Sequence, residues 1–247
     1  MRTALGLMFV LAGFLPAARA ADETYHVQKG DVVLFLGDSI TAETKYWYKL
    51  YYDDIAKKYP ELIVGEKPKY NGAGFGTAGL KFVNGGLSGD IAAGGLKRLP
   101  GLLAQHKATV CVVCFGMNDR YKDRKGYIAT MKAIVQKLKE AKVAVTLLTS
   151  PCVCPIKHAE LQPFVATLGE MAKEVQALAA EEGVGYADCY TPTKQYMDEK
   201  KKDFTWGDGI HPNEDGHRMM ADALQAAWGF GQPLAKEGAP RTPAKTK

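Results

Sequence analysis

Short runs of β-branched and aliphatic residues alternate along this chain with longer stretches in which apolar residues recur at helical spacing. Residues 110–115 form the clearest short run, which is apolar throughout, as expected of a strand that is covered on both faces. Tyr127, Met131 and Ile134 belong to a longer stretch with the spacing of one helix face. Such alternation predicts parallel strands that are joined by helices.

The pattern predicts about five strands and the helices that connect them. The expected strands are residues 32–36, 80–83, 110–115, 143–148 and 184–187. The expected helices are residues 48–59, 91–105, 127–138, 159–182 and 215–228, with an interruption of the second helix at Pro100-Gly101. The predicted fold is therefore α/β: a three-layer α/β/α sandwich of the flavodoxin-like kind with about five parallel strands.

Four short motifs stand out against this pattern. They are GDSIT (37–41), NGGLSGD (84–90), GMND (116–119) and DGIH (208–211). The first three directly follow predicted strands, and ligands of open parallel sheets bind beyond the carboxyl ends of the strands. The predicted topology therefore brings three of the four motifs to one rim of the sheet.

Ser39 is the candidate nucleophile, because it follows the first strand through a Gly-Asp turn. A neutral hydroxyl needs a general base, although the same position also suits a serine that only caps a helix. His211 is the one histidine with an aspartate three residues before it, so Asp208 can hold Nδ1 and leave Nε2 for Ser39. His217, inside the last helix, is interpreted as a packed or solvated residue.

The candidate oxyanion hole combines three donors. They are the peptide N–H of Gly86, the side-chain amide of Asn118 and the peptide N–H of Ser39. A glycine at position 86 would leave room for substrate to approach the backbone. Asp38 and Asp90 flank these motifs, and for both we expect hydrogen bonds that fix the turn backbone.

The order of the four motifs resembles that of the SGNH (GDSL-type) hydrolase family, from about residue 32 to about residue 228. The resemblance implies that Ser39, Gly86, Asn118 and His211 are the four block residues, with Asp208 as the orienting acid. It further implies a carboxylic ester hydrolase that works through an acyl-enzyme, with no metal and no organic cofactor. A Gly-rich insertion at residues 71–79 leaves the substrate open.

The first twenty residues read as a secretory signal. Arg2 precedes a short apolar run, and Ala18-Arg19-Ala20 is a small-x-small cleavage site. The run is shorter than the roughly 20 residues that span a bilayer, so we expect a secreted or periplasmic protein with no stable membrane insertion; a retained N-terminal anchor is the alternative. The predicted domains are a signal at residues 1–20, a hydrolase domain at 21–234 and a disordered basic tail at 235–247.

The charge and the cysteine positions argue against a nucleic-acid ligand and against a zinc site. The net charge is +5, which falls to about +3 once Arg2 and Arg19 leave with the signal, and scattered basic residues do not indicate nucleic acid. Cys111 and Cys114 form a CxxC, but residues three apart on one strand face opposite ways, so we expect buried thiols and no zinc site. Export would permit a disulfide among Cys152, Cys154 and Cys189.

The predicted substrate is a short-acyl ester, above all an acetyl ester, of a small carbohydrate or polysaccharide. Export would place the enzyme among such sugars, and aromatic residues near the motifs suit sugar faces: Tyr46, Trp47, Phe75, Phe204 and Trp206. Several of these rings could equally serve packing. The alternatives are a lysophospholipase- or thioesterase-like acyl hydrolase, a non-catalytic carbohydrate-binding protein on the same fold, and a flavodoxin-type cofactor binder.

Overall fold

The computed structural model describes residues 25–43, 47–64 and 74–234, which build one six-stranded sheet. The strands are β1 (Asp31–Gly37), β2 (Gly74–Gly76), β3 (Leu80–Gly86), β4 (Val110–Cys114), β5 (Ala144–Leu148) and β6 (Gly185–Ala187). Their order in the sheet is β2-β3-β1-β4-β5-β6, and every pair is parallel except β2 with β3. The five parallel strands follow the flavodoxin-like order, which confirms the predicted fold class.

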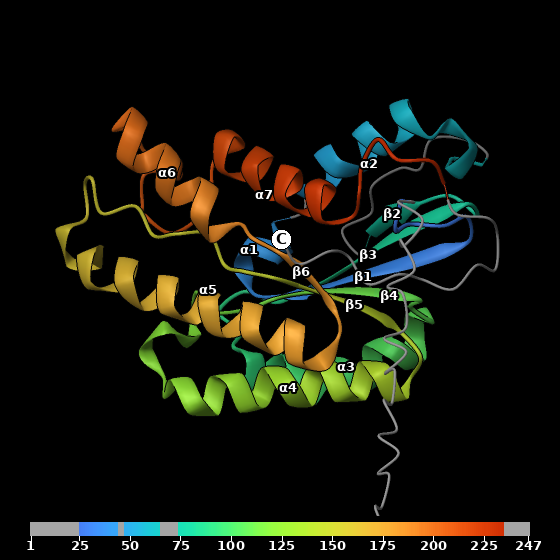
Figure 1. Cartoon of the computed structure of the whole chain (residues 1–247), viewed down its shortest axis with the longest axis horizontal. Helices are drawn as coiled ribbons and strands as arrows, with labels where there is room; N and C mark the ends of the chain where they lie inside the picture. Colours follow the sequence, from blue (N-terminus) through green and yellow to red (C-terminus); the bar gives the residue numbers. More distant parts are fainter. Residues whose placement is uncertain (1–24, 44–46, 65–73, 235–247) are drawn as a thin grey trace, which may run out of the picture.

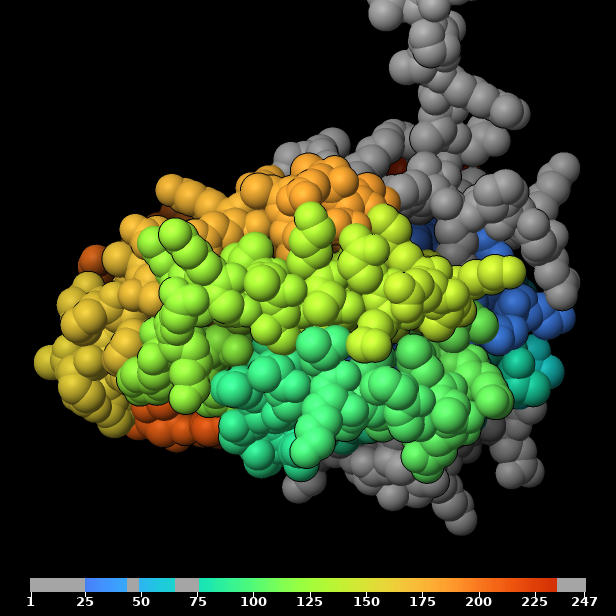
Figure 2. All heavy atoms as spheres, turned by 90° about the horizontal axis from the view of Figure 1, so that it is seen from below, coloured from blue at the N-terminus to red at the C-terminus, as the bar shows by residue number. Residues whose placement is uncertain are grey.

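Helices cover both faces of the sheet (Figure 1). The helices are α1 (Ser39–Ala42), α2 (Trp47–Lys58), α3 (Ala92–His106), α4 (Arg124–Glu140), α5 (Gln162–Glu182), α6 (Tyr190–Lys200) and α7 (Glu214–Ala227). Three 3₁₀ turns join them: η1 (Pro60–Leu62), η2 (Asp119–Tyr121) and η3 (Ala159–Leu161). In Figure 1, α2 and α7 lie on one side of the sheet, and α3, α4 and α5 lie on the other. Figure 2 shows the second face, where α4 packs between α3 and α5.

The central strands are buried on both faces, as their apolar sequences predict. All five residues of β4 are buried, and β1 is buried at every position except Val32. The register of β1 sets Gly37 opposite both Gly86 of β3 and Cys114 of β4. The carboxyl ends of these three strands are therefore level, and the motifs that follow them start from the same edge.

Three elements differ from the prediction. Helix α3 continues through Pro100, which lies on its exposed side, where water can satisfy the carbonyl that proline leaves without an amide donor. Gly94 and Gly95 lie within this helix, and a Cβ at Gly95 would lie 2.4 Å from the Phe115 ring. Strand β2 and helix α6 were not predicted. The proposed signal and the proposed basic tail lie outside the described residues.

The cysteines behave as small apolar residues. All five are buried free thiols, so the disulfide that export would permit among Cys152, Cys154 and Cys189 is not formed in this structure. Within the described ranges, no group of His, Cys, Asp and Glu side chains is arranged to hold a metal ion. The same ranges contain no helix with the length and apolarity needed to cross a membrane.

Candidate active site

The segment after β1 places Ser39 at the start of helix α1. Gly37 has to be a glycine, because a Cβ there would lie 2.6 Å from the carbonyl oxygen of Cys114 and 2.1 Å from Oγ1 of Thr41. Asp38 caps α1: its Oδ1 accepts a hydrogen bond of 3.0 Å from the peptide N–H of Ile40. This contact confirms the predicted turn-fixing role of Asp38. Burial raises the pKa of Asp38 to about 7.

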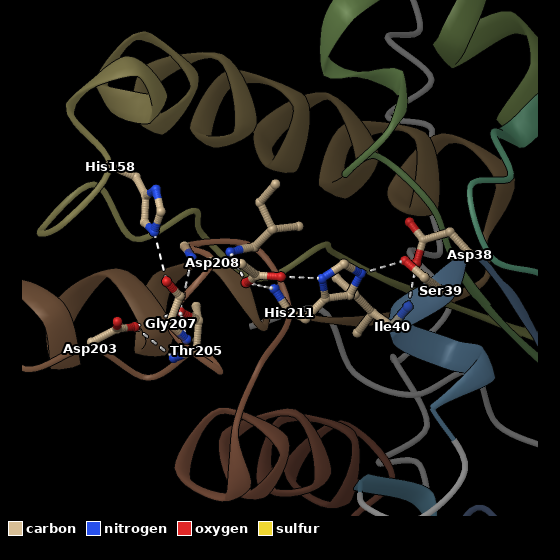
Figure 3. A network of polar contacts seen from close by, with 11 residues as sticks. Asp38, Ser39, Ile40, His158, Asp203, Thr205, Gly207, Asp208 and His211 are labelled. Carbon is tan, nitrogen blue, oxygen red and sulfur yellow. Dashed lines mark hydrogen bonds and ion pairs between the residues drawn. The ribbon is translucent and has the colours of Figure 1, made fainter.

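Ser39, His211 and Asp208 form one continuous chain of hydrogen bonds (Figure 3). Oγ of Ser39 lies 2.9 Å from Nε2 of His211, and Nδ1 of His211 lies 2.6 Å from Oδ2 of Asp208. A carboxylate only accepts hydrogen bonds, so Nδ1 carries the proton and Nε2 presents its lone pair to the serine hydroxyl. The three side chains predicted from the sequence therefore meet with the geometry of a nucleophile, a base and an orienting acid.

The loop that carries Asp208 and His211 is folded by its own polar groups. Oδ1 of Asp208 accepts from the peptide N–H of Ile210 at 2.9 Å and from that of His211 at 2.8 Å. Burial alone would raise the pKa of Asp208, but the hydrogen bonds from the His211 side chain and from these two N–H groups outweigh it and hold the pKa below its usual value. Asp208 therefore stays ionised, as an orienting group requires.

Gly209 lets this loop dock on the segment that follows β5. Its φ of +74° lies in the left-handed region, and a Cβ would lie 2.7 Å from the carbonyl oxygen of Cys154. The peptide N–H of Cys154 in turn donates to the carbonyl of Gly209 at 2.8 Å. The glycine between the two catalytic candidates is therefore required by close backbone contact.

The two late histidines occupy different environments. The His211 side chain is 35% exposed, so substrate and water can reach it. His217 lies fully inside the protein on α7, and burial lowers its pKa to about 3. Of the two states expected for His217, packed or solvated, the structure shows the packed one.

Asn118 lies beside the second motif. Its Nδ2 donates to the backbone carbonyl of Asp90 at 2.9 Å, which leaves the second amide hydrogen for a ligand. Asp90 also fixes its own turn, as predicted, because its Oδ1 accepts from the N–H of Ile91 at 3.0 Å. This contact sets the amide of Asn118 against the loop between β3 and α3.

Gly86 has a different role from the one expected. Its peptide N–H donates to Oδ1 of Asn84 at 2.9 Å, so this N–H already has an acceptor. A Cβ at position 86 would lie 2.2 Å from the backbone nitrogen of Ala42, so the glycine admits helix α1 where we expected substrate. Gly89 in the same motif is exposed, has a φ of +75°, and has no atom within 4 Å of a Cβ position.

His158 is a neighbour that the sequence did not single out. Its Nε2 lies 2.7 Å from the carbonyl oxygen of Gly207, next to Asp208 (Figure 3). Its Nδ1 lies 3.2 Å from Oε1 of Glu160. Both partners only accept hydrogen bonds, so both contacts form only with the doubly protonated ring. The bond to Gly207 and the nearby carboxylates raise the pKa of His158 accordingly. The sequence gives no signal for this role, because one acceptor of His158 lies 49 residues away along the chain and the other lies two residues away.

The aromatic residues near the motifs divide into two groups. Trp206 is 51% exposed just before Asp208, whereas Phe204 is buried in the core. Leu87 and Tyr121, in the segments that follow β3 and β4, are also exposed. Tyr46 lies outside the described residues, as do the side chains of Trp47 and Phe75.

Comparisons with known proteins place this geometry in a family. The model of the GDSL-like lipase/acylhydrolase family matches residues 35–219. Thioesterase 1/protease 1/lysophospholipase L1 of Escherichia coli is 26% identical over 204 residues, which cover 81% of this chain and 84% of that protein.

Among solved structures, an acetylxylan esterase from Geobacillus stearothermophilus superposes with a TM-score of 0.67 at 20% identity, covering 85% of this chain and 100% of that one. An α/β hydrolase enzyme from the metagenome of Lake Arreo, Spain, has a TM-score of 0.65 at 19% identity and covers 83% and 98% of the two chains. These two likenesses concern the fold. Because the family model spans most of the chain, this protein belongs to the GDSL-like lipase/acylhydrolase family and is a carboxylic ester hydrolase.

Proposed function

We propose that this protein is an exported serine esterase that removes short acyl groups, above all acetyl, from carbohydrates. The observation that carries the proposal is the hydrogen-bonded series of Ser39, His211 and Asp208, with 2.9 Å and 2.6 Å between successive side chains. Catalytic mutants of the Geobacillus stearothermophilus acetylxylan esterase likewise replace a serine, a histidine and an aspartate, the aspartate three positions before the histidine.

In the proposed mechanism the first half-reaction transfers the acyl group to Ser39. Nε2 of His211 takes the hydroxyl proton while Oγ of Ser39 attacks the ester carbonyl. The imidazolium, held by Asp208, then gives this proton to the leaving alcohol oxygen, and the carbon–oxygen bond of the ester breaks. In the second half-reaction, water attacks the acyl-serine with His211 again as base, releasing the acid and restoring Ser39.

The oxyanion of each tetrahedral intermediate needs donors aimed at the place where charge develops. Ser39 is the first residue of α1, so its peptide N–H has no acceptor within the helix. The second amide hydrogen of Asn118 supplies another donor. Gly86 could contribute only by releasing Asn84, so we assign the remaining backbone donor to Gly89, which lies next to the Asp90 carbonyl that Asn118 binds.

The substrate class is supported by the surroundings of the triad. Trp206 presents half of its side chain to solvent two residues before Asp208, which suits the apolar face of a sugar ring. The acetylxylan esterases with the same fold act on an acetylated polysaccharide. The predicted signal at residues 1–20 would bring the enzyme to such polymers.

A second candidate is hydrolysis of long-chain acyl thioesters or lysophospholipids. The Escherichia coli relative has these activities in its name and covers most of this chain. Exposed Leu87 and Tyr121 next to the strand ends could hold an acyl chain. We prefer a carbohydrate ester as the substrate because it also gives the exposed Trp206 side chain a role, which is to bind a sugar ring.

A panel of esters separates the two candidates. We expect kcat/KM to be highest for acetyl esters and to fall through butyryl, octanoyl and palmitoyl esters, with acetate released from acetylated xylan. Trp206→Ala should raise KM for acetylated xylooligosaccharides and leave that for a small aryl acetate unchanged. A kcat/KM that rises with chain length would favour the second candidate and reject the first.

A further inference from the structure

Arg98 of helix α3 binds three acceptors on three different segments. Its Nε donates to Oδ2 of Asp90 at 2.8 Å, its Nη2 donates to the carbonyl of Gly37 at 2.8 Å, and its Nη1 donates to the carbonyl of Gly85. The side chain of Arg98 is 23% exposed and that of Asp90 is 8% exposed, so the ion pair is largely shielded from water. Removing a guanidinium from water costs free energy, and the hydrogen bonds to the two carbonyl oxygens offset this cost because they satisfy its remaining N–H groups.

The acceptors belong to the first two motifs of the site. Gly37 is the last residue of β1, two positions before Ser39, and its carbonyl also accepts from the peptide N–H of Leu87 at 3.1 Å. Gly85 and Asp90 lie on either side of the loop that carries Gly89. Arg98 therefore joins the nucleophile segment to both ends of the β3–α3 loop.

Asp90 extends this connection to the third motif, because its backbone carbonyl accepts from Nδ2 of Asn118 at 2.9 Å. The carboxylate of Asp90 fits against α3 only because position 94 is a glycine, where a Cβ would lie 1.8 Å from Oδ1. An unbroken series of contacts thus runs from Gly37 through Arg98 and Asp90 to Asn118. None of these contacts involves His211 or Asp208.

We propose that Arg98 is a positioning residue, which holds the oxyanion donors of Asn118 and the β3–α3 loop at a fixed place relative to Ser39. The inference rests on the function proposed above. A planar guanidinium can reach three acceptors in three directions, whereas the compact ammonium of a lysine keeps the charge without this fork. Arg98→Lys should therefore preserve the ion pair with Asp90 and lose the fixed placement of the two carbonyls.

The test compares Arg98→Lys, Asn118→Ala and the double variant on an aryl acetate. Active sites are counted by complete labelling with a fluorophosphonate, so that kcat refers to folded enzyme alone. We expect Arg98→Lys to lower kcat by about 10- to 100-fold, the effect of a misplacement on the order of 1 Å, with KM changed by less than about threefold. The pH at half-maximal kcat should stay at the wild-type value. In the Asn118→Ala background, Arg98→Lys should lower kcat by a smaller factor than in the wild-type background, since one of the donors that Arg98 positions is absent.

Arg218→Lys is the matched control. Arg218 of α7 links two helices through Asp54 of α2 and also binds Asp222 of its own helix. Arg218→Lys should therefore shift the melting temperature and leave kcat per labelled site unchanged. Wild-type kcat per site in Arg98→Lys would overturn the inference, as would fold-losses that multiply in the double variant. Ser39→Ala, measured on the same aryl acetate, tests the proposed function separately, because full activity in that variant would reject the proposed function whatever the result for Arg98→Lys.

Discussion

Asn118 donates one amide hydrogen to the Asp90 carbonyl and is assigned the other as a donor to the oxyanion. Asn118→Ala should lower kcat by ~10²–10³, the range for the loss of one such donor. KM should change little, because the contact strengthens only in the transition state. Steady-state kinetics on an acetyl ester measure both, and an effect confined to KM would make Asn118 a substrate-binding residue.

Gly86 and Gly89 lie three residues apart in the same motif but should respond differently to alanine. Gly86→Ala places a methyl group 2.2 Å from the Ala42 nitrogen, so it should lower stability by about 1–3 kcal/mol and displace α1. Gly89→Ala meets no atom within 4 Å, but the φ of +75° costs about 1–2 kcal/mol and should turn the N–H away. We expect about tenfold lower kcat and a melting temperature that falls by only a few degrees. Wild-type kcat in Gly89→Ala would contradict its assignment as a donor.

These residues also show which parts of the site can be predicted from the sequence. The triad could be predicted because its members leave local patterns. One pattern is a serine directly after a strand, and the other is an aspartate three residues before a histidine. The expectation for Gly86 differed from the structure because it depends on Asn84 and Ala42, whose positions follow from tertiary packing. Arg98 and His158 had no local signal, since their partners lie on other segments.

At the scale of elements, helix α7 carries a buried histidine whose protonation opposes folding. Because burial lowers the pKa of His217 to about 3, the unfolded chain takes up this proton first as the pH falls below about 6.5. The native state therefore loses stability between about pH 6.5 and pH 3, by about 1.4 kcal/mol per unit of pKa difference. The raised pKa of Asp38 has the opposite sign, since its stabilising proton is lost as the pH rises towards about 7.

His217→Gln removes the contribution of His217 to the pH dependence of stability and keeps that of Asp38. The free energy of unfolding of the variant minus that of the wild type should be a few kcal/mol larger at pH 4 than at pH 7. Urea unfolding of both proteins at the two pH values measures the difference, in which Asp38 cancels. A stability difference that does not vary with pH would show that His217 is not neutral in the folded state.

The five thiols are buried on strand β4, in the segment after β5 and at the start of helix α6. Burial raises the pKa of Cys152 to about 12 and raises that of Cys114 and Cys189 well above the usual value. A thiol reagent at pH 8 without reductant should therefore label less than one cysteine per native molecule. In guanidinium chloride all five should react; three reactive thiols would instead indicate a disulfide.

Most elements could be predicted because apolar periodicity records which faces are buried. Pro100 was taken as an interruption of α3 because its local effect on a helix is unfavourable, but an exposed position in a packed helix tolerates it. Strand β2 consists of Gly74, Phe75 and Gly76 and is defined by pairing with β3, which three residues do not encode. Helix α6 has a weak apolar stripe, since Thr193 and Met197 are its buried residues.

At the scale of the whole molecule, the parallel sheet brings three motifs to one edge, and the loop before α7 brings the fourth. The level ends of β1, β3 and β4 follow from their register, which sets Gly37 beside Gly86 and Cys114. Residues 172 positions apart in the chain thereby approach to 2.9 Å. This arrangement is the basis for assigning Ser39 as the nucleophile.

The most direct test of that assignment is to locate the covalent adduct. The protein is treated with a fluorophosphonate, digested and analysed by mass spectrometry, alongside Ser39→Ala. We predict one adduct per molecule on Ser39, no adduct on the folded variant, and turnover lower by several powers of ten in that variant. An adduct on another residue, or a Ser39→Ala protein with wild-type turnover, would contradict the account.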